Sequence, residues 1–248
     1  MPPKRKLLSE PATDKAVRRR AITFTDAQER HVLEYFGRFR DGTEAEIMTD
    51  LRWLVAELTR RVGPAECERL RRFLIAYGVN RTFPGLAAQG PSCLLPLVQH
   101  LQARQKTLLL GPSTGQAEIV HEVEALVDAC AAAKFNRNMS FASKCVNMLG
   151  QRAPIYSSEA TAYLKHQGHT LKLGNATGGY DAFCRAWYAE YENHRAGYEA
   201  AASKHLASGG PAATGDVAAQ LEACLGVEWF AMRGFDVKLM AEGGPMRK

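Results

Sequence analysis

The sequence predicts an all-α protein, a helical globule that follows a basic tail. Apolar residues recur at helical spacing along most of the chain, and capping residues or glycine and proline breaks separate the segments. We see no convincing stretch with the alternating pattern of a β-strand. Hydrophobic residues make up 46% of the 248 residues, which is ordinary for a packed globule. We expect a disordered tail at 1–22, a single helical domain at 23–243 and a short disordered tail at 244–248.

The first three helices are predicted from their starting signals. Thr25 and Gln28 form a capping-box pattern, which begins a helix that runs to about residue 39. Thr43 and Glu46 repeat the pattern for a second helix, and Pro64 suits the first position of a third. The second helix carries one apolar stripe: Ile47, Leu51, Leu54, Leu58 and Val62.

The rest of the chain reads as further helices separated by loops. Residues 78–91 hold three glycines and two prolines, which predicts a loop, and so does the Gly- and Asn-rich stretch 174–179. Aromatic residues between 180 and 191 have helical spacing, which favours a core-facing helix over a base-stacking platform. The expected helices span about 93–105, 114–134, 140–149, 158–167, 180–206, 215–225 and 227–241.

The net charge of +6 belongs almost entirely to the N-terminal residues. Residues 1–20 contain seven basic and two acidic side chains, a net charge of +5, which leaves +1 for the other 228 residues. The clusters at 4–6 and 18–20 resemble a bipartite nuclear localisation signal. A solubilising tail or a phosphate-binding arm fits the same composition. The basic pI is therefore an argument about this tail and not about the folded body.

Several classes of protein are disfavoured by composition. No apolar run approaches the ~20 residues of a membrane span, and the N-terminus lacks a signal-peptide pattern. The six cysteines form no CxxC pair and the seven histidines are isolated, so we expect no metal, no cofactor and no disulfide framework. We expect a nuclear or cytoplasmic protein in a reducing compartment, not a secreted one.

Residues 132–160 carry the most informative pattern. A helix ends near Lys134, a polar turn follows, and a second helix begins near Ser140, which is a helix–hairpin–helix arrangement. Backbone N–H groups at such a helix start can bind a phosphate, and Arg137 adds charge. An extended stretch, 153–156, then leads to a helix capped by Ser157 or Ser158.

Two short matches give this region a family resemblance. Residues 140–144, Ser-Phe-Ala-Ser-Lys, and 154–158, Pro-Ile-Tyr-Ser-Ser, resemble the active-site region of 8-oxoguanine-DNA-glycosylase-like proteins, members of the helix–hairpin–helix glycosylase superfamily. The family shows a Ser-Lys pair, an apolar helix and then Pro-Ile-Tyr-Asp-Ser. Weaker matches extend the resemblance over about 115–243: Tyr180, Phe183, Arg233, Asp236 and Leu239.

The resemblance implies a catalytic lysine and a carboxylate that act on a flipped-out nucleotide. Lys144 matches the lysine that attacks the sugar carbon, and Ser157 stands where the family has its catalytic Asp. Ser157 can cap a helix but supplies no negative charge. Glu159 is two residues on, and we expect it to point elsewhere. Because Lys144 and Ser157 are only 13 residues apart, Lys144 is also a candidate for phosphate contact.

We therefore expect a DNA-binding protein that resembles a base-excision glycosylase and whose catalysis is altered or degenerate. The catalytic candidates are Lys144 and Ser157. The nucleic-acid-binding candidates are Arg137, Asn138, Ser140, Ser143 and Arg152. The alternatives are a non-enzymatic helical scaffold for a protein partner and a nuclear regulatory protein that binds nucleic acid through its tail. Basic clusters that converge in space favour DNA binding, and acidic residues among them favour the scaffold.

Overall fold

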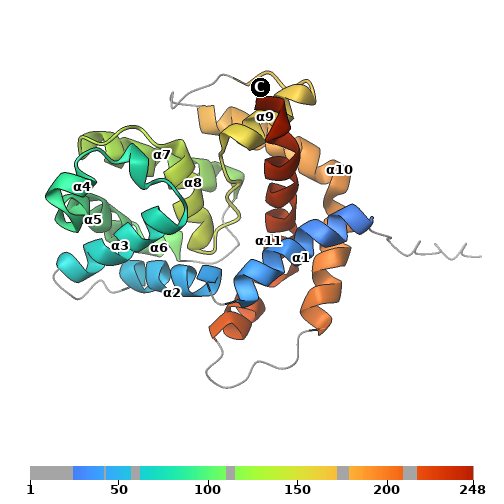
Figure 1. The fold of residues 1–248 in the computed structure, drawn as a ribbon, viewed down its shortest axis with the longest axis horizontal. Helices are drawn as coiled ribbons and strands as arrows, with labels where there is room; N and C mark the ends of the chain where they lie inside the picture. The colour runs from blue at the N-terminus through green and yellow to red at the C-terminus, as the bar shows by residue number, and fades with distance from the viewer. Residues whose placement is uncertain are drawn as a thin grey trace, which may run out of the picture.

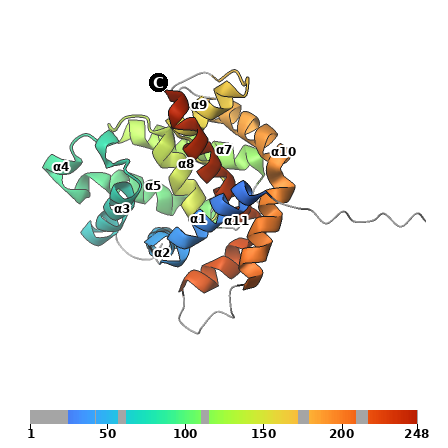
Figure 2. The ribbon, with the colours of Figure 1, turned by 45° about the vertical axis from the view of Figure 1, so that its right-hand side comes forward.

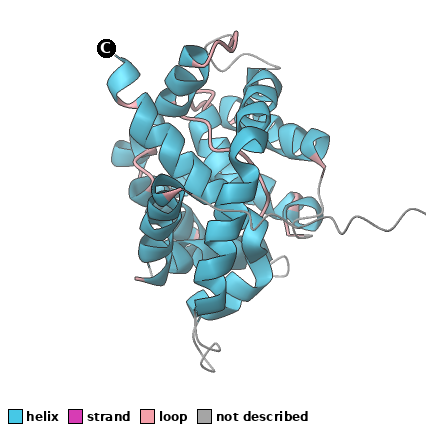
Figure 3. Cartoon of the chain, turned by 90° about the vertical axis from the view of Figure 1, so that its right-hand side faces the viewer, coloured by secondary structure: helices cyan, strands magenta, loops and turns pink. Residues whose placement is uncertain are grey.

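The structure is a computed structural model that describes residues 25–41, 43–56, 62–109, 115–171, 179–208 and 217–247. Within these ranges every regular element is a helix, so the predicted all-α class is confirmed (Figure 3). The predicted tail at 1–22 lies outside the described residues. The elements are α1 (Asp26–Arg40), α2 (Thr43–Ala56), α3 (Pro64–Ala76), η1 (Asn80–Thr82), α4 (Leu86–Gln89), η2 (Pro91–Leu94), α5 (Leu95–Ala103), α6 (Gln105–Leu108), α7 (Gln116–Ala132), α8 (Met139–Met148), α9 (Ser158–His166), α10 (Gly179–Ser208), α11 (Val217–Gly243) and η3 (Pro245–Arg247).

The helices form two groups around one continuous hydrophobic core. The middle of the chain, α3 to α8, makes one group, and α1 with α9, α10 and α11 makes the other (Figure 1). Helix α2 packs against α3, α5 and α8 on one side and against α1 and α11 on the other. Helix α1 packs extensively against α11, so the first and last long helices of the chain lie together (Figure 2).

The helix boundaries follow the signals in the sequence. Thr25 accepts a hydrogen bond from the Gln28 backbone and Gln28 returns one to Thr25, which confirms the capping box of α1. Pro64 opens α3 as predicted. Gly226 has a φ of 74°, which breaks α11 between the two helices that the sequence predicts there.

The aromatic face of α10 belongs to the core, as predicted. Tyr180, Phe183, Trp187 and Tyr191 are each at most 1% exposed. The Trp187 ring centroid lies 5.0 Å from that of Phe235 on α11, in an edge-on contact. This face therefore offers no surface on which a base could stack.

Residues 78–91 differ from the loop that the sequence predicts. They contain the helical turns η1 and α4 and part of η2. Gly78 and Gly85 have positive φ values of 64° and 88°, so the chain reverses direction there, and Phe83 is buried between the turns. The predicted helix over 93–105 is likewise divided into short pieces around Arg104, whose φ/ψ lie outside the helical region.

At the C-terminus, Pro245–Arg247 form the short helix η3, which packs against α9 and α11. The sequence predicts a tail over 244–248.

Candidate functional site

The predicted hairpin joins α7 to α8 through residues 133–138. Lys134 takes a left-handed conformation with a φ of 62°, which reverses the chain after α7. Phe135 anchors the turn, because its ring centroid lies 5.1 Å from that of Phe83. Asn138 caps α8, since its side chain accepts a hydrogen bond from the Phe141 backbone at 2.9 Å. The hairpin is thus held by a buried aromatic pair and a cap.

The chain turns at residues 149–150 and runs without regular structure to α9, and side chains fix the segment 149–157, called the extended segment below, along its length. The donor and acceptor pairs are Arg52 Nη1 to Leu149 O (2.7 Å), Tyr188 OH to Arg152 O (2.9 Å), Asn147 Nδ2 to Ala153 O (2.8 Å), Tyr180 OH to Pro154 O (2.7 Å) and Tyr156 N to Ser143 Oγ (3.0 Å). Asp236 accepts a further hydrogen bond from the Ile155 backbone. The segment makes no regular ladder, so these side chains supply the partners that its buried backbone needs.

A cavity of about 650 Å³, called the hairpin cavity below, lies where the starts of α8 and α9 face the turn after α3. Four of the seven predicted site residues line it, and both catalytic candidates are among the four. Its lining residues are Gly78, Val79, Arg81, Thr82, Asn138, Ser140, Lys144, Tyr156, Ser157, Ser158 and Glu159.

Lys144 is partly buried at the wall of the hairpin cavity. Its Nζ donates a hydrogen bond to the Tyr77 carbonyl at 3.3 Å and lies 5.9 Å from the centre of the Tyr77 ring. Burial lowers the pKa of Lys144, the charge of Arg233 lowers it further, and Glu159 and Glu44 oppose the shift. A larger share of this amine is therefore uncharged, and nucleophilic, near neutral pH than for an exposed lysine.

Ser157 caps α9, as the sequence predicts. Its Oγ accepts a hydrogen bond from the Ala160 backbone at 3.0 Å, which satisfies one of the free N–H groups of the first turn. The sequence predicts that Glu159, two residues on, points in a different direction from Ser157. Glu159 nevertheless lines the same cavity as Lys144 and Ser157, because the first turn of α9 forms part of the cavity wall.

The remaining candidates divide between the cavity and other places. Asn138 and Ser140 line it. Ser143 is fully buried and accepts the Tyr156 N–H, so it holds the extended segment and presents nothing to a ligand. Arg137 lies on the hairpin, 2.7 Å from Asp128. Arg152 does not line the cavity, and it forms an ion pair with Glu228 at 2.6 Å.

Sequence reasoning missed one cationic member of the hairpin cavity. Arg81 lies on η1, in the segment that the sequence predicts as a loop, and no motif marks it. Its position follows from the reversals at Gly78 and Gly85, which are visible only in the folded backbone.

A second cavity of about 290 Å³ lies on the other side of Lys144 and is called the Arg233 cavity below. Arg233 is 3% exposed and forms a buried ion pair with Asp236 at 2.7 Å. Burial raises the pKa of Asp236 to about 6, although the Arg233 charge and a 3.0 Å hydrogen bond from Trp187 Nε1 oppose it. The other lining residues are Arg38, Glu44, Ile47, Ala76, Tyr77, Lys144, Ile155 and Met240.

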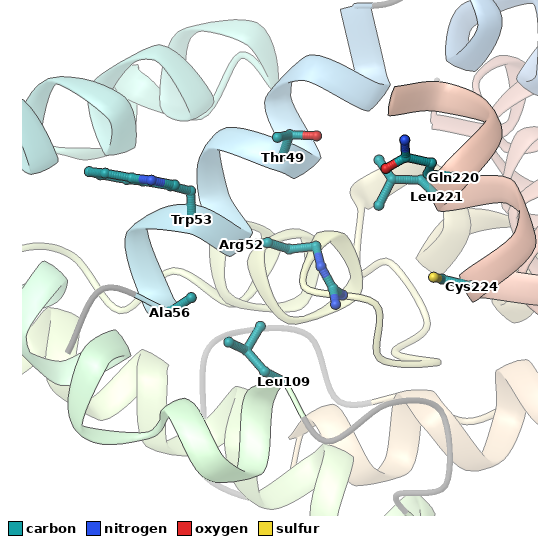
Figure 4. A pocket seen from close by; sticks show the side chains of 8 residues that line it. All are labelled: Thr49, Arg52, Trp53, Ala56, Leu109, Gln220, Leu221 and Cys224. Atoms are coloured by element: carbon teal, nitrogen blue, oxygen red, sulfur yellow. The ribbon is translucent and has the colours of Figure 1, made fainter. Parts of the chain in front are cut away.

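A third, largely apolar pocket of about 400 Å³ lies between α2 and α11 (Figure 4). Arg52 extends from α2 into this space, and its guanidinium is used by the hydrogen bond to the Leu149 carbonyl. The pocket holds no pair of acid and base and no activated nucleophile, so it offers no chemistry comparable to that of the hairpin cavity. Its lining residues are Thr49, Arg52, Trp53, Ala56, Leu109, Gln220, Leu221 and Cys224.

The described residues contain no group of three or more His, Cys, Asp or Glu side chains placed to hold a metal ion. None of their helices combines the length and the apolar character needed to cross a membrane. Comparison with protein-family models, with curated proteins and with solved structures gave no match.

Proposed function

We propose that this protein binds damaged DNA at the hairpin cavity and resembles a base-excision glycosylase whose chemistry has been altered at the carboxylate position. One observation carries the proposal. Lys144 and Ser157, which match the family's lysine and aspartate positions, line a single cavity beside a helix–hairpin–helix turn.

The lining of the cavity suits a sugar–phosphate backbone. Arg81 and Lys144 contribute positive charge, and Ser140, Ser157 and Ser158 contribute hydroxyl groups. The first turns of α8 and α9 add the positive ends of two helix dipoles on the same side. A phosphate and its neighbouring sugar find charge, donors and space together here.

The chemistry that these residues support best is reaction with an abasic sugar. The ring-opened sugar carries an aldehyde at C1′, and an uncharged Lys144 amine attacks that carbon and forms an imine with loss of water. Base excision needs a negative charge opposite the developing oxocarbenium ion. Ser157 supplies none, so we expect wild-type protein to favour abasic sites over intact damaged bases.

The test is borohydride trapping on duplexes that carry 8-oxoguanine, uracil or an abasic site. We expect a covalent product with the abasic duplex, lost in Lys144→Ala and retained in Lys165→Ala, which changes an exposed lysine of α9. Ser157→Asp should add base excision, because it restores the carboxylate. Trapping that survives Lys144→Ala would contradict the assignment.

The basic tail needs its own control. Binding to the abasic duplex should persist, at reduced affinity and with a weaker salt dependence, in protein lacking residues 1–22, because fewer cations then contact phosphate. If all binding disappears with the tail, the hairpin cavity is not the DNA site.

The second candidate is a scaffold that binds another protein, and the pairing of its arginines favours it. On α3, Arg69 and Arg72 both contact Asp50, and Arg71 contacts Glu68. This basic cluster is thereby neutralised and adds little to a DNA-binding face. Wild-type protein that neither binds nor traps any of the three duplexes would favour this alternative.

A further inference from the structure

Glu159 is a carboxylate on the same cavity as Lys144. It occupies the first turn of α9, two residues after the cap Ser157, and its Oε2 accepts a hydrogen bond from Ser158 Oγ at 3.2 Å. Lys144 reaches the cavity from α8. An amine-bearing and a carboxylate-bearing residue from two different helices therefore line one space of about 650 Å³, and the Glu159 charge acts on the Lys144 amine. The space is large enough for an abasic sugar.

The backbone at Glu159 is fixed from behind by the end of α11. A Cβ added at Gly243 would collide with the Glu159 carbonyl, so these two backbones touch. The extended segment 149–157 fixes the other side of the α9 start through its side-chain hydrogen bonds. Glu159 is thus carried on a rigid turn, as a catalytic group must be.

We propose that Glu159 acts as the base in strand scission at an abasic sugar. The inference rests on the proposed function. It concerns only the C2′ proton of the sugar, and position 157, where base excision needs a carboxylate, still has none.

The step balances without any further reactant. Lys144 Nζ forms the imine with C1′ of the sugar and water leaves. The Glu159 carboxylate takes the proton from C2′, the electrons of that C–H bond form a C2′–C3′ double bond, and the C3′–O bond breaks. The phosphate leaves with the electron pair of that bond, and the strand is cut on its 3′ side.

Glu44 is the competing carboxylate and lies on the wrong side of Lys144. It lines the Arg233 cavity and is absent from the lining of the hairpin cavity. Its carboxylate also accepts a hydrogen bond from the Tyr77 hydroxyl. A base for the C2′ proton must be on the sugar's side, which is the side of Glu159.

The experiment separates imine formation from strand scission on an abasic duplex, using the full chain. In Glu159→Gln we expect borohydride trapping to persist while scission falls by about 100-fold, the usual range for loss of a positioned base. Glu192→Gln, an exposed carboxylate of α10, is the matched control and should cut like wild type. Glu159→Asp should retain part of the activity, and Ser157→Asp combined with Glu159→Gln should recover scission.

The pH profile of trapping gives a second readout that a structural role would not move. The charges that act on Lys144 are those of Arg233 from α11, Glu159 from α9 and Glu44 from α2. Its amine also donates a hydrogen bond to the carbonyl of Tyr77, the residue after α3. Removing the Glu159 charge should shift the rise of trapping to lower pH, because that charge favours the protonated amine.

The outcomes distinguish the two proposals. Scission at the wild-type rate in Glu159→Gln, with trapping intact, overturns the role of Glu159 and leaves the DNA-binding function standing. Loss of strand scission in Glu44→Gln, with scission intact in Glu159→Gln, overturns the role of Glu159 in the same way. Wild-type protein that binds the abasic duplex but does not trap it overturns the role of Glu159, because no imine forms, and leaves DNA binding standing. Wild-type protein that neither binds nor traps it overturns both proposals. Thermal unfolding of each variant confirms that it is folded.

Discussion

At the scale of single residues, Lys144 is the position where function and stability conflict. Its amine is partly buried, no carboxylate of the described residues lies within ion-pair distance of it, and the charge of Arg233 disfavours its protonated form. Burying an ammonium group in this way costs folding free energy unless the charge is compensated. The hydrogen bond to the Tyr77 carbonyl offsets only part of this cost, and a residue that costs stability in this way is typical of a functional site.

Replacing Lys144 by Met should therefore stabilise the protein at neutral pH. The folded-state pKa of Lys144 is below its unfolded value, so the wild-type penalty is fully present below the folded pKa and fades as pH rises from there to the unfolded pKa. We expect Lys144→Met to raise the free energy of unfolding by about 1 kcal/mol at pH 7, with a smaller gain near pH 10. Urea unfolding at both pH values measures this. A gain that is the same at both would mean that the charge is not the cause.

The residues of the site differ in how far the sequence could predict them. Ser157 and Thr25 were predictable as caps, because a cap interacts with backbone within the next few residues. Ser143 and Glu159 were not, because their surroundings come from distant segments. The partner of Ser143 is 13 residues away, and the place of Glu159 depends on the cavity wall that η1 and α8 build.

At the scale of elements, the extended segment 149–157 decides where α9 begins. It has no periodicity of its own, and its carbonyls find their partners on α2, α8 and α10. The hydroxyl of Tyr180 is the buried partner of the Pro154 carbonyl, three residues before Ser157. Loss of that partner leaves a buried acceptor without a donor.

The change Tyr180→Phe tests this element. It should lower the free energy of unfolding by about 1–3 kcal/mol, because the Pro154 carbonyl stays buried and loses its hydrogen bond. Tyr191→Phe is the matched control on the same helix, since the Tyr191 hydroxyl is buried and has no hydrogen-bond partner in the described part of the chain. Denaturant unfolding of the two variants compares them. Equal losses would show that the ring and not the hydrogen bond matters.

Helix positions were predictable where periodicity is long. The helices from α7 to α10 lie within a few residues of their expected ranges, because each carries an apolar stripe of two turns or more. The helices η1, α4 and η2 were not predicted. A helix of three or four residues has no period to detect, and glycine and proline there indicate a loop equally well.

At the scale of the whole molecule, Asp236 connects three parts of the fold. Its carboxylate forms an ion pair with Arg233 on α11. It also accepts hydrogen bonds from the Trp187 indole on α10 and from the Ile155 backbone in the extended segment. All of these groups are buried. The two helix groups therefore meet at one polar cluster inside an otherwise aromatic and aliphatic core.

Removal of this carboxylate should destabilise the whole molecule. We expect Asp236→Ala to lower the free energy of unfolding by about 3–5 kcal/mol, because it leaves the buried Arg233 charge without its partner. Adding Arg233→Met to Asp236→Ala should recover part of the loss. Asp181→Ala breaks an exposed pair with Arg185 and should change stability by less than about 1 kcal/mol. A double variant as unstable as Asp236→Ala alone would argue against an unpaired charge.

The pairing of α1 with α11 fixes the order in which the molecule can be completed during synthesis. Helix α1 buries Val32, Tyr35 and Phe36 largely against α11, and the Phe36 and Phe230 ring centroids lie 4.3 Å apart. Roughly 180 residues separate the end of α1 from the start of α11, so α11 is synthesised much later than α1. Until then, the part of the α1 apolar face that α11 covers stays open to chaperones and to aggregation.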